Sequence, residues 1–306
     1  MINRRRINWR SALLTVFLTF CGTQTAGAED LFHVETSEAP AYPSLSIGRA
    51  PLYGEGFEHF PWVNPDAPKG CKLTESARGS FDSLNTWIVK GRSPTAIHGL
   101  IYDSLLVSSP DEDMVAYGLI ANRVETFEDG RRTVFHIDPR AVFHDGHPIT
   151  AQDVLFSVAT LKASGRPFFQ VMLKGLEIEA LDDARVELRI PDGMDPTVIL
   201  EFAELPVLPE HYWKERDFGA TTLEPFLGSG PYRIGKVDAG RRVVLARVED
   251  YWAKDLPVNK GRFNFDEMAY EYFFDEVGAF QAFLAGDIDK FVDSNARRPA
   301  STLPMR

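Results

Sequence analysis

One stretch of the chain, from Arg132 to Gly165, changes from strand-like to helix-like within a few residues, which limits the folds open to it. Residues 132–138 follow the turn pair Asp129-Gly130 and are predicted to form a β-strand. The segment AQDVLFSVATLKA, which begins at Ala151, carries its apolar residues on one face, as an amphipathic helix does. Residues 184–190 then alternate strictly between apolar and charged side chains, which indicates a half-buried strand. A mixed α/β fold is therefore expected.

The junction between this strand and this helix is marked by turn and capping residues. Asp145-Gly146 is a pair typical of tight turns. Thr150 precedes the helix and Asp153 follows three residues later, which resembles a capping box with Asp in place of the more usual Glu. Gly165 is expected to end the helix.

Further elements are predicted on both sides of this stretch. Strands are expected at residues 71–76, 232–237, 242–248 and 266–273, the middle two forming a hairpin. Helices are expected at residues 94–106 and 275–285. In the second helix, Val277, Phe280 and Leu284 are expected to face the core.

The same junction carries two histidines, His144 and His147, which raise the question of a metal site. Because Gly146 and Pro148 interrupt them, the two rings lie on a turn and not on a helix face. A structural zinc site needs four ligands, normally including cysteines, and the zincin motif His-Glu-x-x-His does not occur. The histidines are therefore interpreted as solvated turn residues, and neither a metal nor a cofactor is predicted.

Motifs for nucleophilic or nucleotide chemistry do not occur in the sequence either. The stretch Gly228-Ser229-Gly230-Pro231 is too short for a Gly-x-Ser-x-Gly elbow, and there is no phosphate loop or Gly-x-Gly-x-x-Gly. No catalytic residue is predicted, and the chain is not expected to be an enzyme.

The N-terminus has the pattern of a secretory signal peptide. Four arginines precede a short apolar run and a small-residue segment ending at Ala28. Cleavage after Ala28 would leave 306 − 28 = 278 residues with a net charge of −11 − 4 = −15 and a single cysteine, Cys71. Such an acidic surface repels nucleic acid. An exported chain without a disulfide or a stable membrane anchor is expected; the alternative is a retained N-terminal anchor.

The whole stretch TVFHIDPRAVFHDGHPITAQDVLFSVATLK resembles the signature region of the extracellular solute-binding proteins of family 5. In that family a strand, a Phe-x-Asp-Gly-x-Pro turn and a Thr-Ala-x-Asp-Val helix follow one another. The matching positions are Phe143, Asp145, Gly146, Pro148, Thr150, Ala151, Asp153 and Val154.

Three further blocks resemble the family in the same order. They are LPVLPEHYW (residues 205–213), GSGPYRI, which contains Gly228, Gly230, Pro231 and Tyr232, and the segment 250–289 that ends in Ala-Gly-x-x-Asp. FPWVNPDAPKG, GSFDSLNTWIVKG and LPVNKGRFNFDE are similar to the oligopeptide and microcin-C-type components within the family. Cys71 is a local departure, since glycine is expected at that position.

The resemblance implies a type II periplasmic binding protein fold with two lobes that close on a ligand. It also implies a periplasmic monomer that captures peptides and delivers them to the permease and ATPase subunits of an ABC importer. Residues expected to face the ligand are Gly79, Ser80, Phe81, Asp82 and Leu84.

Family members are much longer than 306 residues, so the chain is expected to contain mainly the first lobe, with the second lobe largely missing. The expected division is a signal peptide at 1–28, an extended wrapping segment at 29–70, the first lobe at 71–289 and a divergent tail at 290–306. Truncation predicts impaired peptide binding. Two alternatives stay open: an exported metal-dependent or serine hydrolase, and a docking fragment without a transport role.

Overall fold

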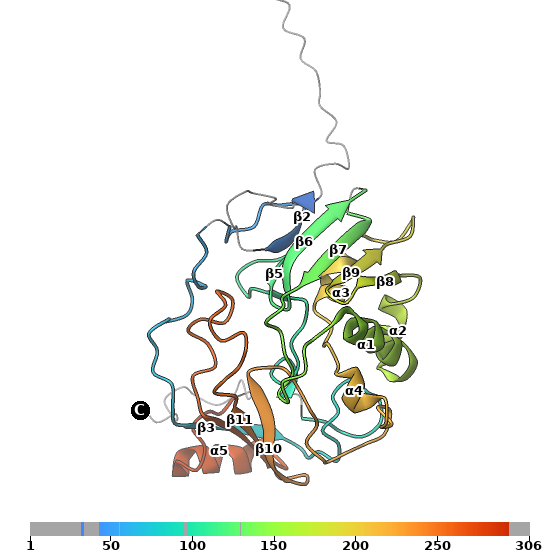
Figure 1. Ribbon diagram of the computed structural model, residues 1–306. Helices are drawn as coiled ribbons and strands as arrows, with labels where there is room; N and C mark the ends of the chain where they lie inside the picture. The colour runs from blue at the N-terminus through green and yellow to red at the C-terminus, as the bar shows by residue number, and fades with distance from the viewer. Residues whose placement is uncertain (1–31, 34–42, 55, 95–96, 129, 294–306) are drawn as a thin grey trace, which may run out of the picture.

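The computed structural model describes residues 32–33, 43–54, 56–94, 97–128 and 130–293. Within these ranges the chain forms three four-stranded sheets and five helices (Figure 1). The expected signal peptide and most of the expected tail lie outside them. No helix in these ranges is long and apolar enough to cross a bilayer.

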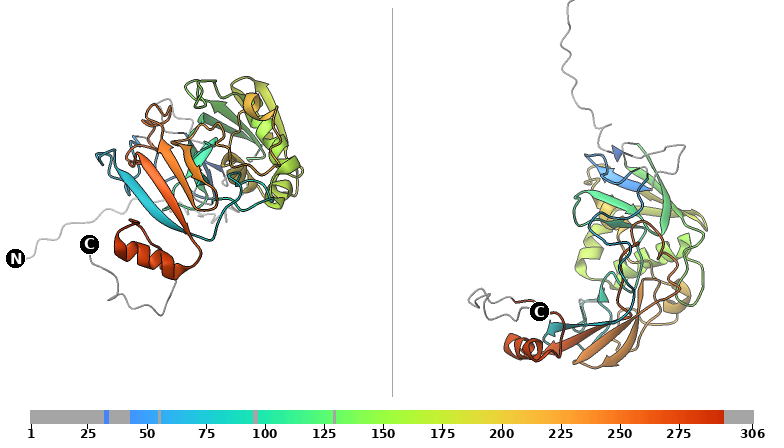
Figure 2. Two further views of the ribbon diagram at one scale, coloured as in Figure 1. Left: turned by 90° about the horizontal axis from the view of Figure 1, so that it is seen from below. Right: turned by 90° about the vertical axis from the view of Figure 1, so that its left-hand side faces the viewer.

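The first sheet combines strands from opposite ends of the described chain. Its order is β10-β11-β12-β3, with β3 at Lys72–Arg78, β10 at Tyr232–Asp238, β11 at Arg242–Arg247 and β12 at Glu267–Phe273. β3 lies parallel to β12, whereas the other neighbours are antiparallel. Figure 2 shows β3 and β12 side by side, with α5 (Glu276–Ala285) next to them. The four strands predicted for this region are confirmed.

The second sheet contains the strands predicted around the junction. Its order is β6-β7-β9-β8 and all its pairings are antiparallel, with β6 at Ala121–Phe127, β7 at Arg132–Ile137, β8 at Glu177–Asp182 and β9 at Arg185–Arg189. α1 (Ala151–Ser164) packs on β8 and β9, and α2 (Pro167–Met172) packs on α1 (Figure 1). Val154, Val158 and Leu161, which lie on the predicted apolar face of this helix, are buried.

The third sheet corrects one prediction. Its order is β1-β2-β5-β4, with β1 at Phe32–His33, β2 at Ser44–Ile47, β4 at Leu106–Ser108 and β5 at Val115–Gly118. The helix predicted at residues 94–106 is wrong, because residues 97–105 form turns leading into β4. The carbonyls of Leu100 and Ile101 accept hydrogen bonds from the backbone of residues 229–232 in place of hydrogen bonds within a helix.

The helix predicted at residues 275–285 is present, but the prediction of its buried residues is only partly right. Phe280 is half-buried and packs on Phe291, with ring centroids 5.6 Å apart. Val277 is 64% exposed and Leu284 is also exposed, whereas Ala279 is the buried residue of α5. Phe274, just before the helix, is 95% exposed. Val277 and Leu284 therefore leave part of the apolar face of α5 exposed.

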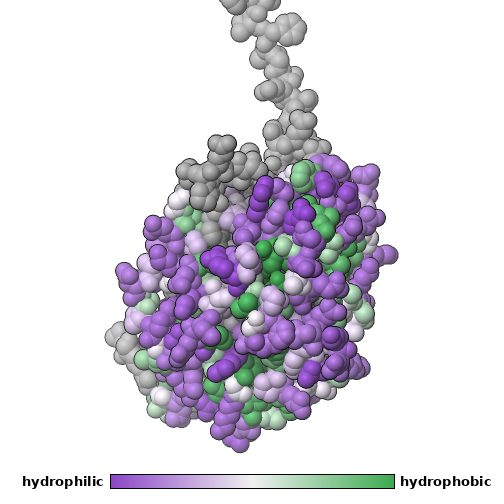
Figure 3. Space-filling view, in the orientation of Figure 1, coloured by the Kyte–Doolittle hydropathy of each residue, from purple (hydrophilic) through white to green (hydrophobic). Residues whose placement is uncertain are grey.

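One main apolar core runs through the second sheet, α1 and the first sheet, and includes α3 (Val198–Ala203) and α4 (Glu210–Trp213). A smaller aromatic cluster holds the extended segment before β3 against β5. There the Phe60 ring stacks on Trp62 and meets Tyr117 edge-on, with centroids 5.0 and 5.8 Å away. On the face shown in Figure 3, hydrophobic residues form only small separate patches among hydrophilic ones.

Candidate functional site

The carboxyl ends of β3 and β12 form an open edge of the first sheet. The register pairs Arg78 with Phe273, the last residues of the two parallel strands. Beyond them, the backbone N–H of Gly79 donates to the carbonyl of Phe273 at 2.8 Å, which keeps the two departing segments together. Ligands of open α/β sheets bind at the carboxyl ends of strands, so this edge is the natural place for a binding site.

The residues predicted to face a ligand follow β3 directly and divide into exposed and buried ones. Gly79 and Ser80 are exposed, and Gly79 has φ +90°, which favours glycine. Phe81 is 2% exposed and packs on Tyr272 with ring centroids 5.0 Å apart. Leu84 is fully buried.

Asp82 is exposed, but one of its oxygens has a structural partner. Its Oδ1 accepts a hydrogen bond of 2.6 Å from the backbone N–H of Arg92, which closes the loop after β3. The second oxygen of Asp82, the Ser80 hydroxyl and the backbone of Gly79 form the exposed polar surface of this loop. The aromatic and aliphatic members of the predicted set contribute packing.

A hollow of about 260 Å³ lies beside this edge. It contains groups of both charges together with apolar surface; its lining is Ser76, Ala77, Arg78, Asp275, Glu276, Ala279, Phe291 and Val292. Asp275 accepts from the backbone N–H of Gly278 at 2.9 Å and so caps α5. We define this hollow and residues 79–82 as the β3 edge site.

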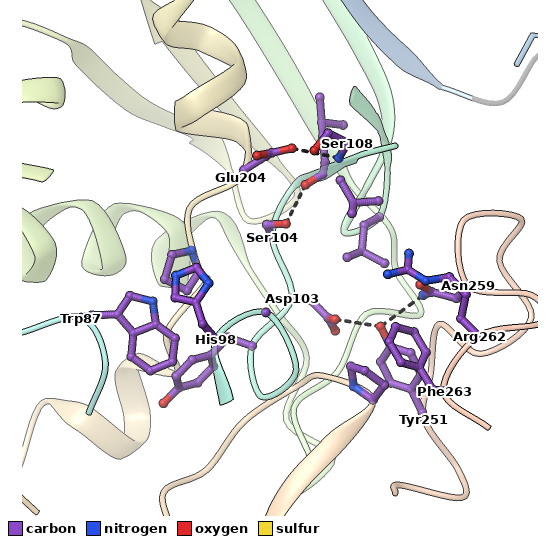
Figure 4. Close-up of a pocket in the computed structure, with 17 residues that line it drawn as sticks. Trp87, His98, Asp103, Ser104, Ser108, Glu204, Tyr251, Asn259, Arg262 and Phe263 are labelled. Carbon is purple, nitrogen blue, oxygen red and sulfur yellow. Dashed lines mark hydrogen bonds between the residues drawn. The ribbon is translucent and has the colours of Figure 1, made fainter. Parts of the chain in front are cut away.

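A second hollow, of about 210 Å³, lies between the segment before β4 and the segment from Tyr251 to Phe263 (Figure 4). Its centre is the buried carboxylate of Asp103, which accepts from Tyr251 Oη at 2.7 Å and from Trp252 Nε1 at 2.9 Å. Asn259 Nδ2 donates to the same Tyr251 oxygen at 3.2 Å. Because both carboxylate oxygens are engaged, this network joins two distant chain segments and leaves Asp103 little capacity for a ligand.

Burial raises the pKa of Asp103 to about 7, and the hydrogen bonds from Tyr251 and Trp252 oppose that rise. Burial also lowers the pKa of Arg262, which lines the same hollow. No sequence motif marks Asp103, and its neighbours Tyr251 and Trp252 are far away along the chain. This network could not have been found from the sequence.

The signature turn lies at the start of the helix that it was predicted to lead into. Phe143 is buried, and its backbone exchanges hydrogen bonds of 2.9 Å with the carbonyl of His147 and the N–H of Gly146. Gly146 has φ +86°, which favours glycine. Pro148 is exposed and forms an isolated antiparallel β-bridge with Val142.

The expected capping box is present. Asp153 Oδ2 accepts from the backbone N–H of Thr150 at 2.9 Å and from its hydroxyl at 2.8 Å. Asp153 Oδ1 accepts from the backbone N–H of Glu210 at 3.0 Å. Asp153 thus also fixes the first residue of α4.

The second signature block packs its glycines against the chain turns before β4. A Cβ atom added to Gly230 would lie 2.5 Å from the carbonyl oxygen of Leu100, and one added to Gly228 would overlap that of Ile101. Pro231 is buried, and the buried Tyr232 donates its hydroxyl to the carbonyl of Phe265 at 2.9 Å. These residues act in packing.

The two histidines of the signature turn take different positions. His144 is half-buried and its Nε2 lies 2.8 Å from the carbonyl oxygen of Gly230, so its interpretation as a solvated turn residue is wrong. Burial lowers its pKa. His147 points instead toward Asp145 and toward His211 on α4. The sequence does not predict that His211 contacts His147 and Asp145, because no motif links it to the signature turn.

Comparison with known proteins agrees with this architecture. The family model for bacterial extracellular solute-binding proteins, family 5 (middle region), matches residues 115–302. The chain is 41% identical over 272 residues to the uncharacterized protein YejA of Escherichia coli, with 88% of the chain and 44% of YejA covered. It is 37% identical to the peptidoglycan-binding protein YepA of Agrobacterium fabrum, with 85% and 44% covered.

The fold is similar to that of the oligopeptide-binding protein AppA from Bacillus subtilis, solved in complex with a nonapeptide. The TM-score is 0.61 at 21% identity, and the match covers 73% of this chain and 44% of AppA. The fold is therefore that of a type II periplasmic binding protein, and the chain spans about half the length of the curated relatives it matches. It belongs to the bacterial extracellular solute-binding proteins of family 5.

Proposed function

We propose that the chain acts as the periplasmic substrate-binding component of an ABC importer, which captures peptides and passes them to the permease and ATPase subunits. The observation that carries this proposal is the β3 edge site, an open and partly polar edge in a chain of this family. In this proposal residues 71–289 form one lobe, and residues 29–70 form the segment that wraps it.

The chemistry of the β3 edge site suits a peptide. Gly79 leaves its part of the backbone uncovered, and Ser80 adds a hydroxyl that can donate and accept. Arg78 is exposed and can pair with a carboxylate, while the apolar part of the lining suits side chains. The names of YepA and AppA point to the same class, since peptidoglycan also contains peptides.

One lobe alone is expected to hold such a ligand weakly. A hinged binding protein gains affinity when a second wall closes on the ligand, because the ligand prefers the closed state. A peptide lying on a single edge keeps one side in water. We therefore expect a dissociation constant of about 1 mM or weaker for these 306 residues.

A titration followed by amide NMR shifts would test the proposal, since it detects millimolar binding and locates it. Two ligands separate the sources of the peptide: a mixed oligopeptide pool and a murein tripeptide. Shifts at Gly79, Ser80 and Asp82 are expected, and Arg78→Glu should abolish them. Lys236→Glu, an exposed charge reversal on the opposite edge strand β10, should leave them unchanged. Shifts confined to other surfaces, or none at saturation, would overturn the assignment.

A further inference from the structure

Three side chains near the start of α1 direct ligand atoms at one point. Asp145, His147 and His211 each place one such atom within 4.8 Å of the other two. Asp145 Oδ2 lies 3.0 Å from His147 Nδ1 and 2.8 Å from His211 Nε2. The two imidazole rings are stacked, with centroids 4.1 Å apart and planes inclined by 23°.

The three groups are held in place by contacts outside the cluster. The other oxygen of Asp145 accepts from the backbone N–H of His147 at 3.2 Å, which orients the carboxylate. The His211 ring meets the buried Phe143 edge-on, with centroids 5.7 Å apart. α4, which carries His211, packs beside α1 and is anchored by the bond from Glu210 to Asp153 (Figure 1).

Two imidazole nitrogens and one carboxylate oxygen form a donor set that suits first-row transition metals such as Zn²⁺, whereas Mg²⁺ and Ca²⁺ prefer oxygen ligands. The side chains of Asp145 and His211 are about one-third exposed and that of His147 is 60% exposed, so an ion can enter from solvent. We propose that Asp145, His147 and His211 together bind one divalent transition-metal ion, with water completing its coordination.

One cation can take the place of the hydrogen bonds within this cluster. Both rings approach the same carboxylate oxygen, and a single cation can serve all three groups after small shifts to bonds of about 2.0–2.2 Å. Bound metal would fasten the signature turn to α4.

The sequence prediction of no metal site is based on His144 and His147 alone. These two residues on one turn supply too few ligands for a metal site. His211, which is 66 residues from Asp145 in the sequence, supplies the missing imidazole. His144 takes no part, because its Nε2 faces the carbonyl of Gly230.

Isothermal titration of the untagged, chelator-treated chain with ZnCl₂ tests the proposal. One Zn²⁺ per chain is expected, with a rise in melting temperature as the site fills. His147→Asn and His211→Gln keep an amide nitrogen near the original ring nitrogen but cannot ligate in the same way, and each should weaken binding at least tenfold. His136→Gln, which alters a His–Glu pair without a second imidazole, should bind like the unchanged chain.

Cobalt provides a check that does not depend on variants. Co²⁺ in the site should show the intense visible bands of a four- or five-coordinate ion, and Zn²⁺ should displace them. The proposal is wrong if the unchanged chain takes up no stoichiometric Zn²⁺, or if the His147→Asn and His211→Gln variants, shown to be folded by circular dichroism, bind it equally well.

Discussion

Asp153 accepts a hydrogen bond of 3.0 Å from the backbone N–H of Glu210, while its second oxygen binds the backbone and hydroxyl of Thr150. The side chain is buried. One carboxylate therefore takes part in the cap of α1 and fixes the first residue of α4. The acid at this position of the signature stretch therefore has two structural roles in this chain.

Asp153→Ala is expected to lower the free energy of unfolding by about 2–4 kcal/mol, since it removes a cap and leaves three part-buried donors without an acceptor. Urea denaturation measures the change. Asp195→Ala, which removes an exposed acceptor from the backbone of Thr197, is the control and should cost about 1 kcal/mol or less. Equal effects of the two changes would contradict the role assigned to Asp153.

Gly230→Ala is expected to destabilise the fold by about 3 kcal/mol or more, because the new methyl group would meet the backbone of Leu100 and Ile101, which cannot move aside easily. Thermal unfolding would show it. Gly278→Ala is the control: the added atom there meets only ordinary contacts of 3.6–3.8 Å, and alanine favours the helix. A Gly230→Ala variant as stable as the Gly278→Ala variant would refute this packing account.

Phe81→Ala is expected to cost about 3–5 kcal/mol, as for other buried phenylalanines. This follows from its packing on Tyr272 and separates a core role from the predicted ligand contact. Phe274→Ala, at a side chain 95% exposed, should change stability by less than about 0.5 kcal/mol. Chemical denaturation of both variants measures the loss of unfolding free energy. A small loss for Phe81→Ala would contradict the core role and favour the predicted ligand contact.

The contribution of Asp103 to the free energy of unfolding should fall as the pH rises from about 4 to 7. Below pH 4 or so the carboxyl is protonated in the folded and the unfolded chain. Between these values the unfolded chain releases the proton, while the buried Asp103, with a pKa raised to about 7, retains it. One pKa unit corresponds to about 1.4 kcal/mol, so the loss is on the order of 4 kcal/mol.

Asp103→Asn should remove this part of the pH dependence, because the amide does not titrate and can still accept one of the two hydrogen bonds. Urea unfolding at several pH values between 4 and 8 measures it against the unchanged chain. Asp192→Asn, at a fully exposed carboxylate, should keep the original profile. An unaltered slope in the Asp103→Asn variant would show that this carboxyl is not the source.

Secondary structure could be predicted where local pattern and packing agree. The alternation in residues 184–190 and the cap at Thr150 were sufficient for β9 and α1. The helix prediction at residues 94–106 is wrong because the apolar spacing there reflects burial in the core, while the carbonyls of Leu100 and Ile101 accept hydrogen bonds from residues 229–232. Cys71, at a position where glycine was expected, has φ 62°, a conformation that favours glycine.

The sequence by itself determined the α/β class, the strand–turn–helix corner and the family, because these depend on residues close together in the chain. It also located the loop after β3, but not which of its side chains are buried. Only the tertiary structure decided that Asp103 meets Tyr251 and that His211 stacks on His147. Contacts between such distant segments depend on how the sheets and helices pack, which no local pattern encodes.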